Sequence, residues 1–278
     1  MVLAVVSLVL ALTQPRWGYQ WEDVHRRGVD IVVALDISNS MRAQDIKPNR
    51  LQRAKHEVAD LLRMLEGDRI GLVAFAGTAY VQCPLTLDYS AARMFLNAMD
   101  MDLLSAQGTA LGTAIRKSVQ AFGPSGRTSR ALVLITDGED QSGDALEAAQ
   151  WAAEQGVKIY PIGIGAKIGA PIPLSGPGGG FKKDAQGNVV LTKLDETTLQ
   201  KIALKTGGTY VRSVTGDLDL EKIYRHNIKQ KLEAKEIQTD RRKLWQERFQ
   251  GFLVLALVFL TAEFLYRERR GTPTFSSR

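Results

Sequence analysis

One carboxylate and two hydroxyl side chains alternate along the short stretch Asp36-Ile-Ser38-Asn-Ser40. Carboxylate and hydroxyl oxygens are the ligands that hard cations such as Mg²⁺ prefer in proteins. The stretch follows the largely apolar, β-branched run 29–35, which is typical of a strand buried on both faces of a parallel sheet. Ligands of open α/β sheets bind outside the carboxyl ends of the strands, so these residues are candidate metal ligands. The alternative is an ordinary loop, because Asp, Ser and Asn also favour turns and helix caps.

Two further oxygen donors come at comparable places in the chain. Thr109 lies directly before a predicted helix at 110–122, and Asp137 follows a second apolar strand predicted at 130–136. Parallel strands end at the same edge of a sheet, so we expect Asp36 and Asp137 to lie close together. Each residue alone also has an ordinary role, Thr109 as a helix cap and Asp137 in a turn. Taken together, Asp36, Ser38, Ser40, Thr109 and Asp137 predict a site for Mg²⁺, with Mn²⁺ as an alternative ion.

A metal-dependent hydrolase is the catalytic alternative for the same residues. Such an enzyme needs a positioned base or nucleophile beside the activated water. The three histidines, at 25, 56 and 226, are far apart in the sequence and show no ligand spacing. Glu139 and Asp140 are the remaining candidates, and we interpret them as residues that solvate the loop. We therefore predict no catalytic residue and a protein that is not an enzyme.

The elements that must position these residues alternate along the chain. Strands are predicted at 69–76, 80–83, 130–136, 158–164 and 209–212, and helices at 48–65, 89–99, 110–122, 145–155 and 194–206. Strands that alternate with helices of this length predict right-handed crossovers and a sheet covered on both faces. The expected fold is α/β and doubly wound, with a mostly parallel, Rossmann-like sheet and one antiparallel edge strand at 80–83.

The segment 165–188 interrupts this alternation. It is rich in Gly and Pro, and its glycine run opens no helix and contains no Gly-Lys-Ser/Thr, so it is not a phosphate-binding loop. We predict a long surface loop that ends in a small hairpin at 181–192 and that offers a second contact surface.

Composition and charge narrow the classes of partner. The net charge of +6 belongs to the C-terminal region, because residues 222–278 hold 13 Lys/Arg against 6 Asp/Glu and the rest holds 23 against 24. A nucleic-acid-binding domain is expected to carry its basic residues on its own surface, so nucleic-acid binding is excluded. Cys83 is the only cysteine, which rules out an intramolecular disulfide.

Both ends of the chain are candidates for membrane segments. Residues 1–14 read as the second half of a membrane helix whose start lies upstream, since twelve helical residues span only about 18 Å. Residues 249–266 form a dense apolar run flanked by arginines and predict a transmembrane helix. A juxtamembrane helix is expected before it at 233–248, and a basic tail follows it at 267–278. The domain between these segments is expected at 22–232.

The motifs Asp36-Ile-Ser38-Asn-Ser40, Thr109 and Thr136-Asp137-Gly138 resemble the metal-ion-dependent adhesion site of von Willebrand factor type A domains. The surrounding segments 47–51, 71–76, 82–88 and 187–191 are similar to the Bat branch of that family, nearer BatB than BatA. The resemblance covers nearly the whole chain, with two departures: the first membrane helix looks incomplete, and a tetratricopeptide tail is missing. It implies that Ser38, Ser40 and Thr109 ligate Mg²⁺ and that Asp36 and Asp137 hold the hydroxyls and waters.

The resemblance also implies a function. It predicts a membrane-anchored, Mg²⁺-dependent module in which the Asp or Glu of a protein partner completes the metal shell. The partners it implies are other Bat proteins and a MoxR-type AAA+ ATPase, in envelope assembly or stress tolerance such as aerotolerance. The expected place is the bacterial inner membrane with the domain in the periplasm. A structural anchor that the metal merely stabilises is the second alternative.

Overall fold

The structure, a computed structural model, describes residues 2–13, 16–23, 28–123, 129–174, 179–213, 224, 228, 241–247 and 249–270. The chain forms two compact units. The larger unit comprises Arg26–Ile237, and the smaller one combines both ends of the chain, Met1–His25 and Gln238–Arg278.

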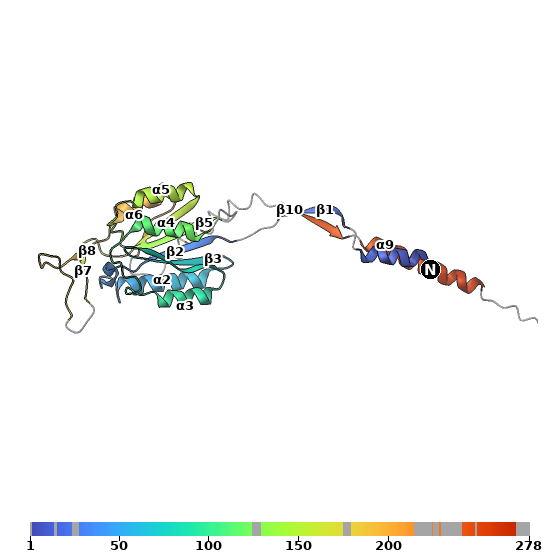
Figure 1. Cartoon of the computed structure of the whole chain (residues 1–278), viewed down its shortest axis with the longest axis horizontal. Coiled ribbons are helices and arrows are strands. Elements are labelled where there is room, and N and C mark those ends of the chain that lie inside the picture. The colour runs from blue at the N-terminus through green and yellow to red at the C-terminus, as the bar shows by residue number, and fades with distance from the viewer. Residues whose placement is uncertain are drawn as a thin grey trace, which may run out of the picture. The chain divides into compact units, whose positions relative to one another are not determined.

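A six-stranded sheet forms the centre of the larger unit (Figure 1). Its strand order is β4 (Ala79–Thr86), β3 (Arg69–Phe75), β2 (Asp30–Asp36), β5 (Arg130–Thr136), β6 (Val157–Gly163) and β9 (Val211–Arg212). Neighbouring strands are parallel except for β4, which pairs with β3 in antiparallel fashion at the edge. This confirms the predicted α/β fold with its antiparallel edge strand.

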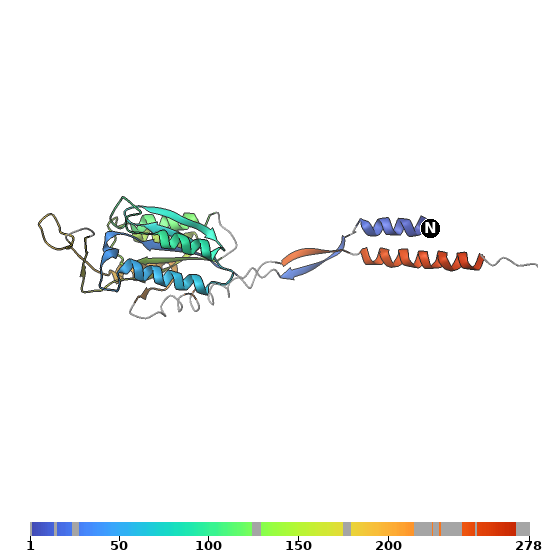
Figure 2. The ribbon, with the colours of Figure 1, turned by 90° about the horizontal axis from the view of Figure 1, so that it is seen from below.

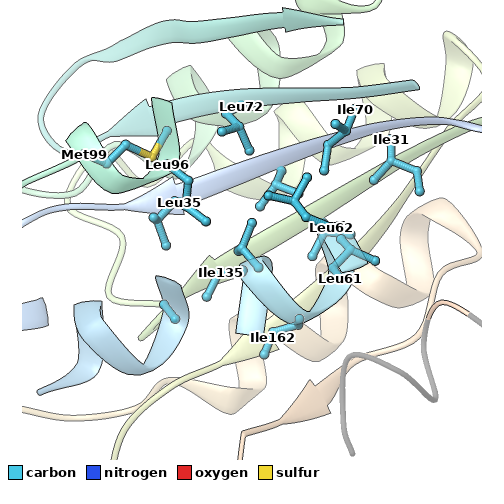
Figure 3. Close-up of a cluster of buried hydrophobic side chains, with 14 of the residues drawn as sticks. Ile31, Leu35, Leu61, Leu62, Ile70, Leu72, Leu96, Met99, Ile135 and Ile162 are labelled. Atoms are coloured by element: carbon cyan, nitrogen blue, oxygen red, sulfur yellow. The ribbon is translucent and has the colours of Figure 1, made fainter. Parts of the chain in front are cut away.

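Helices cover both faces of the sheet, as Figure 1 shows. They are α2 (Arg50–Met64) and α3 (Tyr89–Ala98) on one face, and α4 (Leu111–Ala121), α5 (Ala145–Glu154) and α6 (Glu196–Thr206) on the other. Strand β2 supplies both cores, because successive side chains of a strand point to opposite faces. Ile31 and Leu35 pack with Leu61 and Leu62 of α2 (Figure 3), whereas Val32 packs in the cluster of the opposite face.

Local hydrogen bonds fix where the helices begin. The side chain of Asn49 accepts from the backbone N–H of Gln52 and caps α2, and Asp88 caps α3 in the same way. A short 3₁₀ helix, η1 (Asn39–Arg42), follows β2 and turns the chain toward α2. These caps satisfy N–H groups that the first helical turn leaves without a partner, so each of these two helices begins directly after its cap.

Residues 165–194 form an insert between β6 and α6, and the structure describes 165–174 and 179–194 of it. Strand β7 (Ala170–Pro171) pairs with β8 (Leu191–Thr192), and single bridges join Pro173 to Phe181 and Lys183 to Val189. The predicted hairpin at 181–192 is therefore present, and it also folds back on the first part of the loop. Both views show β7 and β8 beyond one end of the sheet (Figures 1 and 2).

The smaller unit differs from the prediction. Helix α1 (Val2–Leu12) lies beside α9 (Phe249–Arg270), and β1 (Arg16–Asp23) pairs antiparallel with β10 (Arg241–Glu247). The predicted juxtamembrane helix at 233–248 is thus wrong over 241–247, and 233–240 lie outside the described residues. Strand pairing with β1 overrides the helical pattern here, in a register that sets Glu22 opposite Arg242 and Asp23 opposite Arg241.

No helix in the described part of the chain is both long and apolar enough to cross a membrane. The transmembrane helix predicted over 249–266 is thus not found there, although α9 comprises 22 residues. Helix α1 has 11 residues and spans only about 16 Å.

Candidate metal centre

Asp36 lies at the carboxyl end of β2, directly beside the end of β5. The two strands are parallel and in register, with Leu35 opposite Ile135. The hydroxyl of Thr136 therefore reaches Asp36 and donates to its Oδ2 at 2.6 Å. The backbone N–H of Ser38 donates to Oδ1 at 2.9 Å. Asp36 is fully buried, so these two bonds determine how its carboxylate is oriented.

The hydroxyls of Ser38 and Ser40 come together because the chain turns tightly after β2. The N–H of Met41 donates to the carbonyl of Ser38, and that of Ala43 to the carbonyl of Ser40, which forms the turn η1. The two Oγ atoms are 2.9 Å apart and both side chains are buried. Ligands at adjacent corners of a Mg²⁺ octahedron with bonds of about 2.0–2.1 Å are about 2.9 Å apart. The pair thus has the spacing of two ligands of one ion, which would replace the hydrogen bond between them.

Thr109 lies between the loops that follow β3 and β5. The N–H of Ala110 donates to the carbonyl of Ala76 at 2.9 Å, and the N–H of Gln141 donates to the carbonyl of Thr109 at 3.0 Å. Thr109 is buried, and Gly108 before it has a φ of +113°, a conformation that favours glycine. The structure therefore places Thr109 at the same edge of the sheet as Asp36 and Asp137.

Asp137 is held by residues from two distant parts of the chain. Its Oδ2 accepts from Arg50 Nη1 and from Thr192 Oγ1, each at 3.0 Å, and Arg50 Nη1 also donates to Thr192 Oγ1 at 2.9 Å. Its Oδ1 accepts from the N–H of Glu139 at 3.3 Å. Arg50 forms a second ion pair with Asp45 at 2.8 Å, and no part of its side chain is exposed. Asp137 is thus the junction between the metal cluster, helix α2 and the insert.

The electrostatics of the cluster favour a cation. Burial, and after it the charge of Asp137, raise the pKa of Asp36 to about 7, although hydrogen bonds from Thr136 and Ser38 act to lower it. Burial likewise raises the pKa of Glu139. Two buried carboxylates close together favour a bound positive charge. No group of three or more His, Cys, Asp or Glu side chains suited to a metal exists among the described residues, so a metal here depends on the hydroxyls.

The structure brings the predicted residues Asp36, Ser38, Ser40, Thr109 and Asp137 to one edge of the sheet. Sequence reasoning missed Arg50 and Thr192 and quoted Thr136 only as part of a motif, without a role. These three residues hold the two carboxylates. One signal was available for Arg50. It is the first residue of α2, and a cation is unfavourable at the N-terminus of a helix unless an acidic group neutralises it.

Comparisons with known proteins identify the family of this chain. The family model of the von Willebrand factor type A domain matches residues 30–226 of this chain. An uncharacterized protein of Borreliella burgdorferi is 33% identical over 274 residues, which cover 95% of this chain and 76% of that protein.

Two solved structures are similar over most of the chain. The conserved hypothetical protein BatB from Bacteroides thetaiotaomicron is 41% identical with a TM-score of 0.67, covering 76% of this chain and 98% of that one. An aerotolerance-related membrane protein from Bacteroides fragilis is 39% identical with a TM-score of 0.66 and the same coverage. The mussel byssus proximal thread matrix protein 1 with a zinc-occupied MIDAS motif shares the fold, at 18% identity and a TM-score of 0.51, over 88% of this chain and 53% of that one.

Proposed function

Because this chain belongs to the von Willebrand factor type A domain family, and within it to the Bat proteins, we propose that it is a metal-dependent protein-binding module that acts at a membrane. The observation that carries the proposal is the spacing of 2.9 Å between the hydroxyls of Ser38 and Ser40, beside the buried Asp36. Ser38, Ser40 and Thr109 would hold Mg²⁺ or Mn²⁺, and Asp36 and Asp137 would orient the hydroxyls and waters.

The chemistry of these donors favours binding to an acidic group. Hydroxyl oxygens are neutral, so a dication held by them keeps most of its charge. When bound, the ion supplies a position for the Asp or Glu carboxylate of a partner, which completes both the coordination shell and the charge. Thr136 and Arg50 serve this binding by keeping Asp36 and Asp137 in place.

Binding is favoured over hydrolysis because the acidic side chains beside the cluster already have structural partners. Glu139 Oε1 accepts from the backbone N–H of Lys193 at 2.7 Å. Asp140 accepts from the N–H of Leu111 and of Ala145, each at 3.3 Å, at the starts of α4 and α5. Carboxylates fixed in this way are poorly placed to take a proton from water.

Names of similar proteins support a place at the membrane. One neighbour at 39% identity is described as an aerotolerance-related membrane protein. We extend the proposal to the bacterial inner membrane with the larger unit in the periplasm. There the protein acts with other Bat proteins and a MoxR-type AAA+ ATPase in envelope assembly or stress tolerance.

Calorimetric titration of the full chain with Mg²⁺ and with Mn²⁺ tests the proposal. We expect saturable binding in the wild type and its loss in Asp36→Ala and Ser40→Ala. Ser90→Ala, which removes an exposed hydroxyl from α3, is the matched control and should bind like the wild type. Equal heats in all four proteins would refute the metal centre.

A further inference from the structure

The insert displays large apolar side chains to solvent. The exposed fractions within 168–191 are 90% for Ile168, 54% for Leu174, 46% for Phe181, 43% for Val189 and 51% for Leu191. Clustered exposed apolar residues of this kind mark interaction sites on soluble domains. Scattered single residues need no explanation, but five within one short insert do.

The same insert is basic. Lys182, Lys183 and Lys193 are exposed, whereas Lys167 pairs with Glu196 at 2.5 Å. The one acidic residue of the insert, Asp184, accepts from the backbone N–H groups of Gln186 and Asn188 and so closes its own turn. The insert therefore presents positive charge together with apolar side chains.

Both ends of the insert are fastened to the metal cluster. At the start, the N–H of Ala166 donates to Asp45 Oδ2 at 2.7 Å, and Asp45 pairs with Arg50. At the end, Thr192 donates to Asp137, and the N–H of Lys193 donates to Glu139. The insert that carries these apolar and basic side chains is therefore attached at both ends to residues of the metal centre or to residues that pair with them.

We propose that the insert is a second docking surface for the same partner that supplies the carboxylate to the metal. The partner it fits is an acidic protein segment that also carries large apolar side chains. Its carboxylates complement the lysines, and its apolar groups cover Ile168, Phe181 and Leu191. This inference rests on the proposed function. The fastening beside the metal cluster favours a protein segment over an anionic lipid surface, because one partner then satisfies both contacts.

Selection of random peptides displayed on phage, with the full chain as bait and Mg²⁺ present, provides the probe. We expect selected peptides with a net negative charge, at least one Asp or Glu, and apolar neighbours. Fluorescence anisotropy of one synthesised peptide then compares wild type, Ser40→Ala, the double variant Ile168→Ser/Phe181→Ser and Lys182→Glu. Met94→Ser, which removes an apolar side chain that is 63% exposed on α3, is the matched control.

We expect the affinity to fall about tenfold to a hundredfold in the double variant, and also in Lys182→Glu, with Met94→Ser unchanged. Chelation of Mg²⁺ and Ser40→Ala should also weaken binding. If Mg²⁺ and Ser40 matter but the insert variants bind like the wild type, the inference is wrong and the proposed function stands.

Two other outcomes overturn the inference in different ways. Peptide binding that depends on the insert but not on Mg²⁺ or Ser40 separates the two surfaces and counts against the proposed function as well. The second outcome is that no peptide is selected, that the chain sediments with vesicles of anionic lipid, and that Ile168→Ser/Phe181→Ser abolishes this sedimentation. It would assign the insert to a membrane surface instead.

Discussion

Replacing Arg50 by methionine removes a buried cation that pairs with Asp137 at the metal centre and with Asp45 beside it. The Arg50 side chain is fully buried and pairs with Asp137, whose side chain is also fully buried, and with Asp45, whose side chain is 9% exposed. Methionine keeps an unbranched apolar chain of similar length, so the substitution chiefly deletes the charge and the donors. It leaves Asp137 with Thr192 and the N–H of Glu139 as its remaining partners among the bonds described above.

The expected cost follows from burial. Breaking a buried ion pair by removing one partner costs about 3–5 kcal/mol, because the other charge stays buried without compensation. A typical domain is stable by about 5–15 kcal/mol, so Arg50→Met should lose a large share of its unfolding free energy. Arg63→Met on the same helix is the control: its pair with Asp60 is largely exposed, and such pairs contribute about 0–1 kcal/mol.

Urea unfolding of both variants and of the wild type, with chelator present, measures these differences. The pH dependence adds a second check. Burial opposes ionisation of Asp45, but the hydrogen bond and charge of Arg50 outweigh this and lower its pKa from 3.8. A carboxyl with a lowered folded pKa stabilises above that value, so the difference between wild type and Arg50→Met should shrink as the pH falls through it. A loss below about 1 kcal/mol at neutral pH would refute the reasoning that Arg50 neutralises the carboxylates.

Three further outcomes are expected. Without metal, the unfolding free energy should fall as the pH rises from 3.8 to about 7, because folded Asp36 binds a proton more tightly than unfolded Asp36. Urea unfolding at a series of pH values measures this, and Asp36→Asn should flatten the pH profile. Saturating Mg²⁺ should raise the Tm in scanning calorimetry, by the equivalent of about 2.7 kcal/mol at a hundredfold excess over Kd, and an unchanged Tm would contradict the metal centre. Gly165→Ala should destabilise the folded protein by about 1–3 kcal/mol, because Gly165 has a φ of +137° and a Cβ there would lie 2.8 Å from the Arg50 guanidinium. Thermal unfolding should show a smaller effect for the control Gly179→Ala, where the added Cβ meets open space.

The order of elements in the larger unit was predictable from the sequence because its signals are local. The apolar runs 29–35 and 130–136 became β2 and β5, and each ends in the oxygen donors that the prediction placed together. Parallel strands must end at a common edge, so the meeting of Asp36 and Asp137 needed only the fold class. The helical periods were equally informative, with α2 found at Arg50–Met64 for a helix predicted at 48–65.

Contacts between distant residues were beyond the sequence alone. Arg50 and Asp137 are 87 positions apart, and Arg50 and Thr192 are 142 positions apart, so no local pattern links the buried arginine to the metal loop or to the insert. The pairing of β1 with β10 joins the two ends of the chain, and it converted a segment with helical character into a strand. A strand acquires its hydrogen bonds from another segment, whereas a helix supplies its own. The residue types at the metal centre were therefore determined by the sequence, and the arginine, threonines and insert that hold them in place were decided by the tertiary structure.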